Sequence, residues 1–268
     1  MARQHLGNPC WYELATSAGK LKSAGDFYGG VLGWNIADSG MEGFDYHLAK
    51  TDDDMIAGLM VMPEAAAGMP PSWMIYFAVD DADAFVTEAK AAGARVHRQA
   101  ADIPGTGRFA ILADPQGAAF GILQPDMSGM SEADITKAEA GGAFLPGKAG
   151  HATWNELMSS DPDASFAFYS KLFGWTKGDA VGMGDAGIYQ LFRRDGVDIG
   201  GMMGLGQAPA PNWLPYFGVP GGVSDGVEAI RKAGGVVHHG PTEVPGGAFI
   251  ALAQDPQGAW FAVTGATR

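Results

Sequence analysis

The sequence predicts an α+β fold built from four βαβββ modules, and three observations carry this prediction. The pentapeptide DPQGA occurs twice, at 114–118 and at 255–259. The motif DFYGGVLGW at 26–34 returns as AFYSKLFGW at 167–175, with the same spacing of 141 residues. Each copy also contains the pattern strand–helix–strand–strand–strand twice. A self-similarity of this length indicates that a complete folding unit has been duplicated.

The duplication divides the chain into two repeats, which we expect to be domains at 7–125 and 150–265. Both lengths are ordinary for a domain with its own core. The segment between them, 126–149, is small, polar and glycine-containing, so it is predicted to be a linker with a short helix at 131–140.

Apolar alternation and turn residues predict the elements of each repeat. For the first repeat, the expected order is strand 11–15, helix 23–33, strands 34–38, 44–50 and 55–62, strand 73–79, helix 81–93, and strands 95–99, 109–114 and 118–124. The glycine-containing loops at 104–107 and 245–247 precede strands. They therefore lack the helix N-terminus of a phosphate site and are expected to be turns or pocket lips.

The first helix of the second repeat has the clearest signals. Asp161 is expected to cap its N-terminus and Pro162 to lie in its first turn. Gly174, and Gly33 in the first repeat, are expected to end the two equivalent helices.

Charge and cysteine content exclude several classes of function. The formal net charge of −13 and the pI near 4.7 argue against a nucleic-acid partner, because phosphate binding needs clustered Lys and Arg. No apolar run reaches the length of a membrane span, and the N-terminal stretch has no apolar core of a signal peptide. Cys10 is the single cysteine, so no internal disulfide is possible. We therefore expect a cytoplasmic protein that binds neither membrane nor nucleic acid.

Four βαβββ modules, with FYxxxLGW after the first strand and DPxGxxF before the last one, resemble the vicinal-oxygen-chelate superfamily. This superfamily contains glyoxalase I, bleomycin-resistance proteins and extradiol dioxygenases. The resemblance implies two glyoxalase-like domains, each with a curved mixed sheet and outer helices. It also implies a small-molecule partner, and either a monomer that is a pseudo-dimer of its domains or a homodimer.

The resemblance also indicates where metal-dependent relatives carry their ligands, and these positions are apolar here. Metal-binding His, Gln or Glu side chains would stand on the first and last strands of the modules. The chain has Trp11, Trp154, Met74, Leu214, Gly121 and Ala262 there, with Met60 and Met203 near the end of the first module's last strand. Such side chains do not bind Zn, Ni, Mn or Fe. The resemblance thus implies no metal site and no cofactor.

A displaced divalent-metal site is the alternative. It would combine Glu13 or Glu156 with histidines or a glutamine that recur across the repeat. The candidates are His47, Gln190, His97 and His238.

Strand alternation places a carboxylate beside an aromatic ring in both repeats. Glu13 lies on the same face of its strand as Trp11, and Glu156 on the same face as Trp154. Recurring aromatic side chains complete the expected ligand site, since flat rings suit a flat or apolar ligand. The expected ligand-binding residues are Trp11, Glu13, Tyr46, Trp73, Tyr76, Trp154, Glu156, Tyr189, Trp213 and Tyr216.

Two classes of function remain open on this evidence. The first is a bleomycin-resistance-like protein that binds a small, partly apolar or aromatic molecule without metal. The second is an enzyme, a lyase, isomerase or dioxygenase, with a displaced metal site or with Glu13 or Glu156 as general base.

Overall fold

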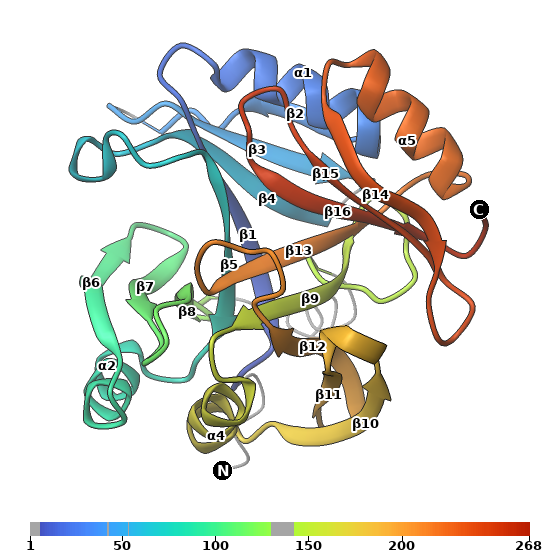
Figure 1. Ribbon diagram of the computed structural model, residues 1–268. Coiled ribbons are helices and arrows are strands. Elements are labelled where there is room, and N and C mark those ends of the chain that lie inside the picture. The colour runs from blue at the N-terminus through green and yellow to red at the C-terminus, as the bar shows by residue number, and fades with distance from the viewer. Residues whose placement is uncertain (1–5, 42, 53, 130–141) are drawn as a thin grey trace. The chain divides into compact units, whose positions relative to one another are not determined.

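A computed structural model describes residues 6–41, 43–52, 54–129 and 142–268. Among these residues it shows two mixed sheets of eight strands each and four α-helices (Figure 1). This confirms the predicted α+β class and the module pattern. The helix predicted at 131–140 lies outside the described residues.

The elements follow the predicted order in both repeats. The first repeat has β1 (Pro9–Thr16), α1 (Leu21–Leu32), β2 (Asn35–Asp38), β3 (Tyr46–Thr51), β4 (Asp54–Val61), a 3₁₀ turn (Glu64–Ala66), β5 (Ser72–Ala78), α2 (Ala82–Ala91), β6 (Arg95–Ile103), β7 (Gly107–Ala113) and β8 (Ala119–Pro125). The second repeat has β9 (Ala152–Ser159), α4 (Pro162–Phe173), β10 (Thr176–Gly182), a 3₁₀ turn (Gly184–Ala186), β11 (Ile188–Arg194), β12 (Val197–Gly204), β13 (Asn212–Gly218), α5 (Val223–Lys232), β14 (Val236–Glu243), β15 (Phe249–Gln254) and β16 (Trp260–Gly265).

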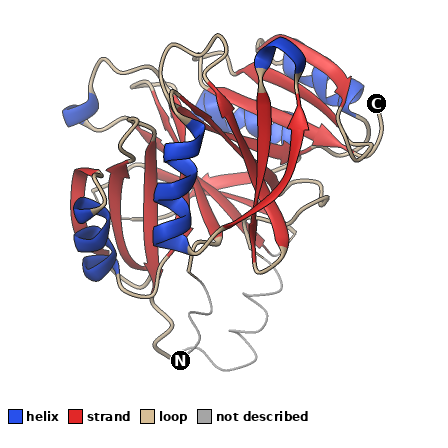
Figure 2. Ribbon diagram, turned by 60° about the horizontal axis from the view of Figure 1, so that its bottom comes forward, coloured by secondary structure: helices blue, strands red, loops and turns tan. Residues whose placement is uncertain are grey.

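The two sheets have equivalent strand orders. The first is β2-β3-β4-β1-β5-β8-β7-β6 and the second is β10-β11-β12-β9-β13-β16-β15-β14. Both sheets are open, because β2 and β6, or β10 and β14, stand at their ends. Within a module the first and last strands pair in parallel, while the other strands pair antiparallel. Figure 2 shows how strands dominate the chain, with the helices beside them.

The predicted helix caps are present. The Asp161 carboxylate accepts the backbone N–H of Ala164 at 3.0 Å, which satisfies one of the donors exposed at the start of α4. Gly174 and Gly33 both adopt the left-handed conformation directly after α4 and α1. That conformation is unfavourable for residues with a Cβ, which explains why both helices end at glycine.

Close contacts divide the chain into two compact units that do not coincide with the repeats. Unit 1 consists of 1–10, 75–140 and 155–213, and unit 2 of 11–74, 141–154 and 214–268. Each unit therefore combines most of one module from each repeat. The domain boundaries expected at 7–125 and 150–265 stay a prediction.

The DPQG turn of each repeat binds the first helix of the other repeat. In unit 2 the Tyr28 hydroxyl of α1 donates to Asp255 Oδ2 at 3.1 Å. In unit 1 the Tyr169 hydroxyl of α4 donates to Asp114 Oδ2 at 3.2 Å. The other carboxylate oxygen of Asp114 accepts the three backbone N–H groups of residues 116–118, which holds the turn itself.

The tryptophan that closes the FYxxxLGW motif makes a second exchange between the repeats. The Trp34 indole donates to the carbonyl of Gly150 at 2.6 Å, within unit 2. The Trp175 indole donates to the carbonyl of Gly7 at 2.9 Å, within unit 1. The DPQG and FYxxxLGW motifs, which identify the duplication, therefore also contain residues that join the two copies.

Candidate functional site

Strand β1 has one buried face and one half-buried face. Tyr12 and Leu14 are fully buried, whereas Trp11 and Glu13 are half-buried. The predicted alternation of side chains is therefore present, and Trp11 and Glu13 share the more accessible face. This face is the candidate functional site.

Tyr46, the first residue of β3, links these two side chains by hydrogen bonds. The Trp11 indole donates to the Tyr46 hydroxyl at 3.1 Å, and that hydroxyl donates to Glu13 Oε2 at 3.0 Å. The sequence placed all three in the expected site, and the structure brings them together. We call this arrangement the Trp11 relay.

Gly58 in β4 makes room for the Tyr46 ring. It is paired in register with Glu13 on one side and with Leu48 on the other. A Cβ at Gly58 would overlap the Tyr46 hydroxyl and ring, so a side chain there would expel the phenol. Sequence reasoning missed Gly58, because a glycine inside a strand does not reveal which ring covers it.

Tyr46 acts as a neutral donor in this relay. Burial, and next the negative charge of Glu13, raise the pKa of the Tyr46 hydroxyl well above its ordinary value. The hydroxyl therefore remains protonated at physiological pH and keeps donating to the carboxylate.

Phe44 adds an exposed aromatic wall that sequence reasoning also missed. Its ring stacks on Tyr46 with centroids 5.8 Å apart and planes 23° apart, and 44% of Phe44 remains exposed. The signal was present, since Phe44 lies two residues from Tyr46 in an alternating stretch. In the second repeat, the position two residues before Tyr189 is Gly187, so Phe44 has no aromatic counterpart there.

Two other Trp–Tyr–carboxylate chains among the described residues are buried. The Trp73 indole donates to Tyr28 at 2.9 Å, and Tyr28 in turn donates to Asp255. Trp73 is only 6% exposed and Tyr28 is fully buried. The predicted ligand residue Trp73 therefore lies in the aromatic core of unit 2.

Trp213 has the equivalent place in unit 1. Its indole donates to Tyr169 at 3.1 Å, and Tyr169 donates to Asp114. Trp213 is 5% exposed, and its ring packs against Trp175 and Phe77. These two chains are buried, in contrast to the half-buried Trp11 relay.

In the second repeat a tyrosine ring also covers a strand glycine, but the glutamate beside it is more buried. The Tyr189 ring covers Gly201, which is paired in register with Glu156. Glu156 is only 7% exposed, whereas Trp154, two residues before it, is half-buried.

The remaining predicted residues, Tyr76 and Tyr216, are buried on their strands. Tyr76 lies opposite Gly121 in β8 and its ring covers that glycine. Tyr216 pairs with Ala262 in β16.

Comparison with known proteins identifies the family. A model of the Glyoxalase/Bleomycin resistance protein/Dioxygenase superfamily matches residues 14–122. CFP32 of Mycobacterium tuberculosis, named as a glyoxylase, is 33% identical over 261 residues, which cover 96% of this chain and 94% of that protein. The chain belongs to this superfamily. DnrV of Streptomyces peucetius, named as an anthracycline biosynthesis protein, is 30% identical over 284 residues. This match covers 98% of the present chain and 94% of DnrV.

Solved structures of the superfamily share the fold. The Mn(II)-bound glyoxalase from Novosphingobium aromaticivorans matches with a TM-score of 0.65 at 16% identity, over 98% of this chain and 83% of that one. The 2,3-dioxygenase LapB from Pseudomonas sp. KL28 matches with a TM-score of 0.67 at 14% identity, over 100% of this chain and 94% of that one.

The positions that the superfamily resemblance assigns to metal ligands do not fit a divalent cation. None of their six side chains carries a suitable oxygen, nitrogen or thiolate ligand. At Gly121, where the resemblance implies a glutamate, the Tyr76 ring fills the space that a Cβ would need.

The alternative of a displaced metal site was based on recurring histidines. The described residues contain no group of three or more His, Cys, Asp or Glu side chains that could hold a metal ion. His238 instead stacks against Trp260, with ring centroids 4.4 Å apart, and its Nε2 lies 2.9 Å from Gln254 Oε1. His47 lies 3.4 Å from Asp45.

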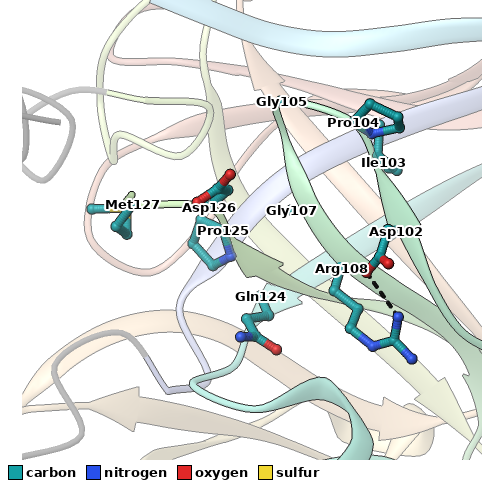
Figure 3. Close-up of a pocket in the computed structure, with 10 residues that line it drawn as sticks. All are labelled: Asp102, Ile103, Pro104, Gly105, Gly107, Arg108, Gln124, Pro125, Asp126 and Met127. Carbon is teal, nitrogen blue, oxygen red and sulfur yellow. Dashed lines mark hydrogen bonds and ion pairs between the residues drawn. The ribbon is translucent and has the colours of Figure 1, made fainter. Parts of the chain in front are cut away.

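An open hollow of about 430 Å³ lies at the β6–β7 turn, away from the Trp11 relay in sequence. Pro104, Gly105 and Gly107 form part of its lining, so this glycine loop is a pocket lip as predicted. Figure 3 shows Arg108 linked to Asp102 there, and Arg108 also binds Asp83 of α2. Its guanidinium is thus already neutralised by two carboxylates.

Among the described residues, no helix has the length and apolar character that crossing a bilayer requires.

Proposed function

We propose that the chain binds a small, partly apolar or aromatic molecule on the half-buried face of β1, without a metal at the superfamily's positions. The observation that carries this proposal is the contrast between the Trp11 relay and two other Trp–Tyr–carboxylate chains. Those two chains are buried and join the repeats, whereas Trp11, Glu13 and Tyr46 are half-buried. Burying a carboxylate is costly unless it is hydrogen-bonded, and the Tyr46 hydroxyl supplies such a bond to the half-buried Glu13.

The chemistry of the face favours a flat ligand with a hydrogen-bond donor. Glu13 offers a carboxylate acceptor, while Trp11 and Phe44 offer flat apolar surfaces. Two relatives of about 30% identity over nearly the whole chain are named as anthracycline biosynthesis proteins. Their names support a polycyclic aromatic compound as the ligand class.

An enzyme with Glu13 as general base is the second candidate. The support for it is Glu13 itself, an accessible carboxylate hydrogen-bonded to a hydroxyl that stays protonated, and the glyoxylase name of CFP32. A base in this position would take a proton from a donor group of the bound molecule.

The test compares Glu13→Gln with Glu156→Gln. Binding of alizarin, a flat hydroxyanthraquinone, is titrated by tryptophan fluorescence, and thermal stability is measured in parallel. We expect Glu13→Gln to weaken alizarin binding about tenfold or more with little loss of stability. We expect Glu156→Gln to lower stability and leave affinity unchanged. Unchanged binding together with lower stability in both variants would show that the glutamates are structural.

Two further measurements separate the binding protein from the enzyme. Elemental analysis of protein purified without added metal tests the metal-dependent alternative. Product formation is then followed by mass spectrometry for the wild type and Glu13→Gln. Turnover that disappears in a variant retaining affinity supports the general base, whereas bound and unchanged compound supports the binding protein.

A further inference from the structure

We propose that Tyr46 occupies the ligand site of its own chain, and that the ligand is a phenol whose hydroxyl replaces the Tyr46 hydroxyl. This inference rests on the proposed function, because it concerns the same face of β1. It adds the chemical class of the group recognised and the reason why the site is filled in this structure.

The first argument is the pair of hydrogen bonds around the Tyr46 oxygen. Trp11 donates to this oxygen and Glu13 accepts from it, at 3.1 and 3.0 Å. A hydroxyl satisfies both partners with one atom, because it accepts from the indole and donates to the carboxylate. A methyl ether has no proton to donate to Glu13. A ligand carboxylate would be repelled by the negative charge of Glu13.

The second argument is the floor on which the ring lies. Because Gly58 has no side chain, the phenol lies directly against the backbone of β4. The slot over this backbone floor, next to the Trp11 indole donor, has the width of one planar ring that carries a hydroxyl. Nothing in the slot requires the ring to belong to the protein.

The third argument is that Tyr46 can leave, whereas the other two relay tyrosines cannot. Tyr28 and Tyr169 stand in α1 and α4 and are fully buried. Tyr46 is half-buried and is the first residue of its strand. Rotation about its side-chain torsions carries the ring toward solvent without breaking the register of β3. Its stacking partner Phe44 is itself exposed, so it does not trap the ring.

The experiment removes the occupant. The probe is 2-naphthol, its control is 2-methoxynaphthalene, and both are titrated calorimetrically against wild type, Tyr46→Ala and Tyr46→Phe. If the phenol of Tyr46 competes for the slot, Tyr46→Ala binds 2-naphthol about tenfold or more tightly than wild type does. Tyr46→Phe, which keeps the ring but loses both hydrogen bonds, should gain a smaller factor. The ether should gain little in either variant.

Tyr189→Ala is the matched control, since Tyr189 also covers a strand glycine but the glutamate paired with that glycine, Glu156, is buried. We expect no gain in 2-naphthol affinity from this variant. Circular dichroism melting curves establish that each variant is folded, and Tyr46→Phe serves if Tyr46→Ala is not.

Weaker binding of 2-naphthol by both Tyr46 variants would overturn the inference, because Tyr46 would then be a wall of the site. The proposed function would survive that result if Glu13→Gln still weakened alizarin binding. If Glu13→Gln changed no affinity in any background, the proposed function itself would fail.

Discussion

At the scale of single residues, one difference between α1 and α4 affects two other side chains. In α4 the Ser165 hydroxyl lies 2.7 Å from Ser159 and donates to Gln116 at 3.0 Å. The equivalent of Ser165 in α1 is Ala24. The counterparts of its two partners, Thr16 Oγ1 and Gln257 Oε1, are buried and have no hydrogen-bond partner among the described residues.

Ala24→Ser should therefore stabilise the protein. The new hydroxyl can bond Thr16 or Gln257, so we expect a gain of about 1 kcal/mol in the free energy of unfolding. Ser165→Ala should cost about 1–3 kcal/mol, because it removes a hydrogen-bond partner of Ser159 at the end of β9 and of Gln116 in the DPQG turn. Urea denaturation measures both values. A loss of stability in Ala24→Ser would show that the site has no room for the hydroxyl.

At the scale of elements, the two relay tyrosines on helices differ in their surroundings from the relay tyrosine on a strand. Tyr28 and Tyr169 project from helices into aromatic cores. The ring centroids of Tyr28 and Trp73 are 5.1 Å apart, and those of Tyr169 and Trp213 are 5.4 Å apart. Tyr46, by contrast, projects from the start of β3, where it is half-buried. The chemical group is the same, and its surroundings decide whether it joins the repeats or marks a site.

Replacing these tyrosines by phenylalanine tests this distinction. Tyr28→Phe and Tyr169→Phe each remove the acceptor of a buried indole and one hydrogen bond of a buried aspartate, so we expect a loss of about 1–3 kcal/mol. Tyr46→Phe should cost less than about 1 kcal/mol, because water can satisfy Trp11 and Glu13. Chemical denaturation of the three variants gives the comparison. Equal losses at all three positions would contradict the accessible character of the Trp11 relay.

Strand glycines provide a second comparison between elements. A Cβ at Gly121 would overlap the buried Tyr76 ring, which has nowhere to go. We expect Gly121→Ala to cost about 1–3 kcal/mol or more, in the range of overpacked cores. Gly58→Ala should cost less, because Tyr46 can turn toward solvent. Melting temperatures rank the two variants, and quenching of tryptophan fluorescence by acrylamide should rise in Gly58→Ala as Trp11 loses its cover.

At the scale of the whole molecule, the two DPQG aspartates influence how stability changes with pH. Burial raises the pKa of both Asp114 and Asp255 above the ordinary value, although the backbone N–H groups of each turn oppose this rise. A carboxyl with a raised pKa in the folded state binds its proton more tightly there than in the unfolded chain. Its contribution to stability is complete below the unfolded pKa and is lost as pH rises through the folded pKa.

The double variant Asp114→Asn, Asp255→Asn removes this dependence. We expect the stability of wild type relative to the variant to decrease as pH rises from about 4 through the raised pKa values. Guanidinium denaturation from pH 3.5 to 7 measures this difference. A difference that grows with pH would mean that the turn amides dominate and that the carboxylates are favoured as anions.

Much of the fold was predictable, because local patterns specify it. Asp161, Gly33 and Gly174 marked helix ends, and alternation placed Trp11 with Glu13 on one face. The pairing of modules was not predictable. Both copies of each motif carry the same chemistry, so the sequence cannot tell whether Asp114 meets the tyrosine of its own repeat or that of the other.

The candidate site was predictable only in part, for the same reason. Trp73 and Trp213 had the residue type of a pocket wall, but their partners are tyrosines on helices, and burial by such contacts has no local signal. The need for glycine at position 58 is visible only in the folded chain, where the Tyr46 ring occupies the space of a Cβ.

The reciprocal hold of each DPQG turn on the other copy's helix also bears on how the gene can change. A duplicated gene segment usually provides a spare, and one copy can then decay without harm. Here the spare does not exist, because Tyr28 depends on Asp255 and Tyr169 depends on Asp114. A damaging change in the turn of one copy loosens the helix of its twin. We therefore expect the two motifs to tolerate change only together, whereas the Tyr46 hydroxyl takes its hydrogen bonds within the first repeat.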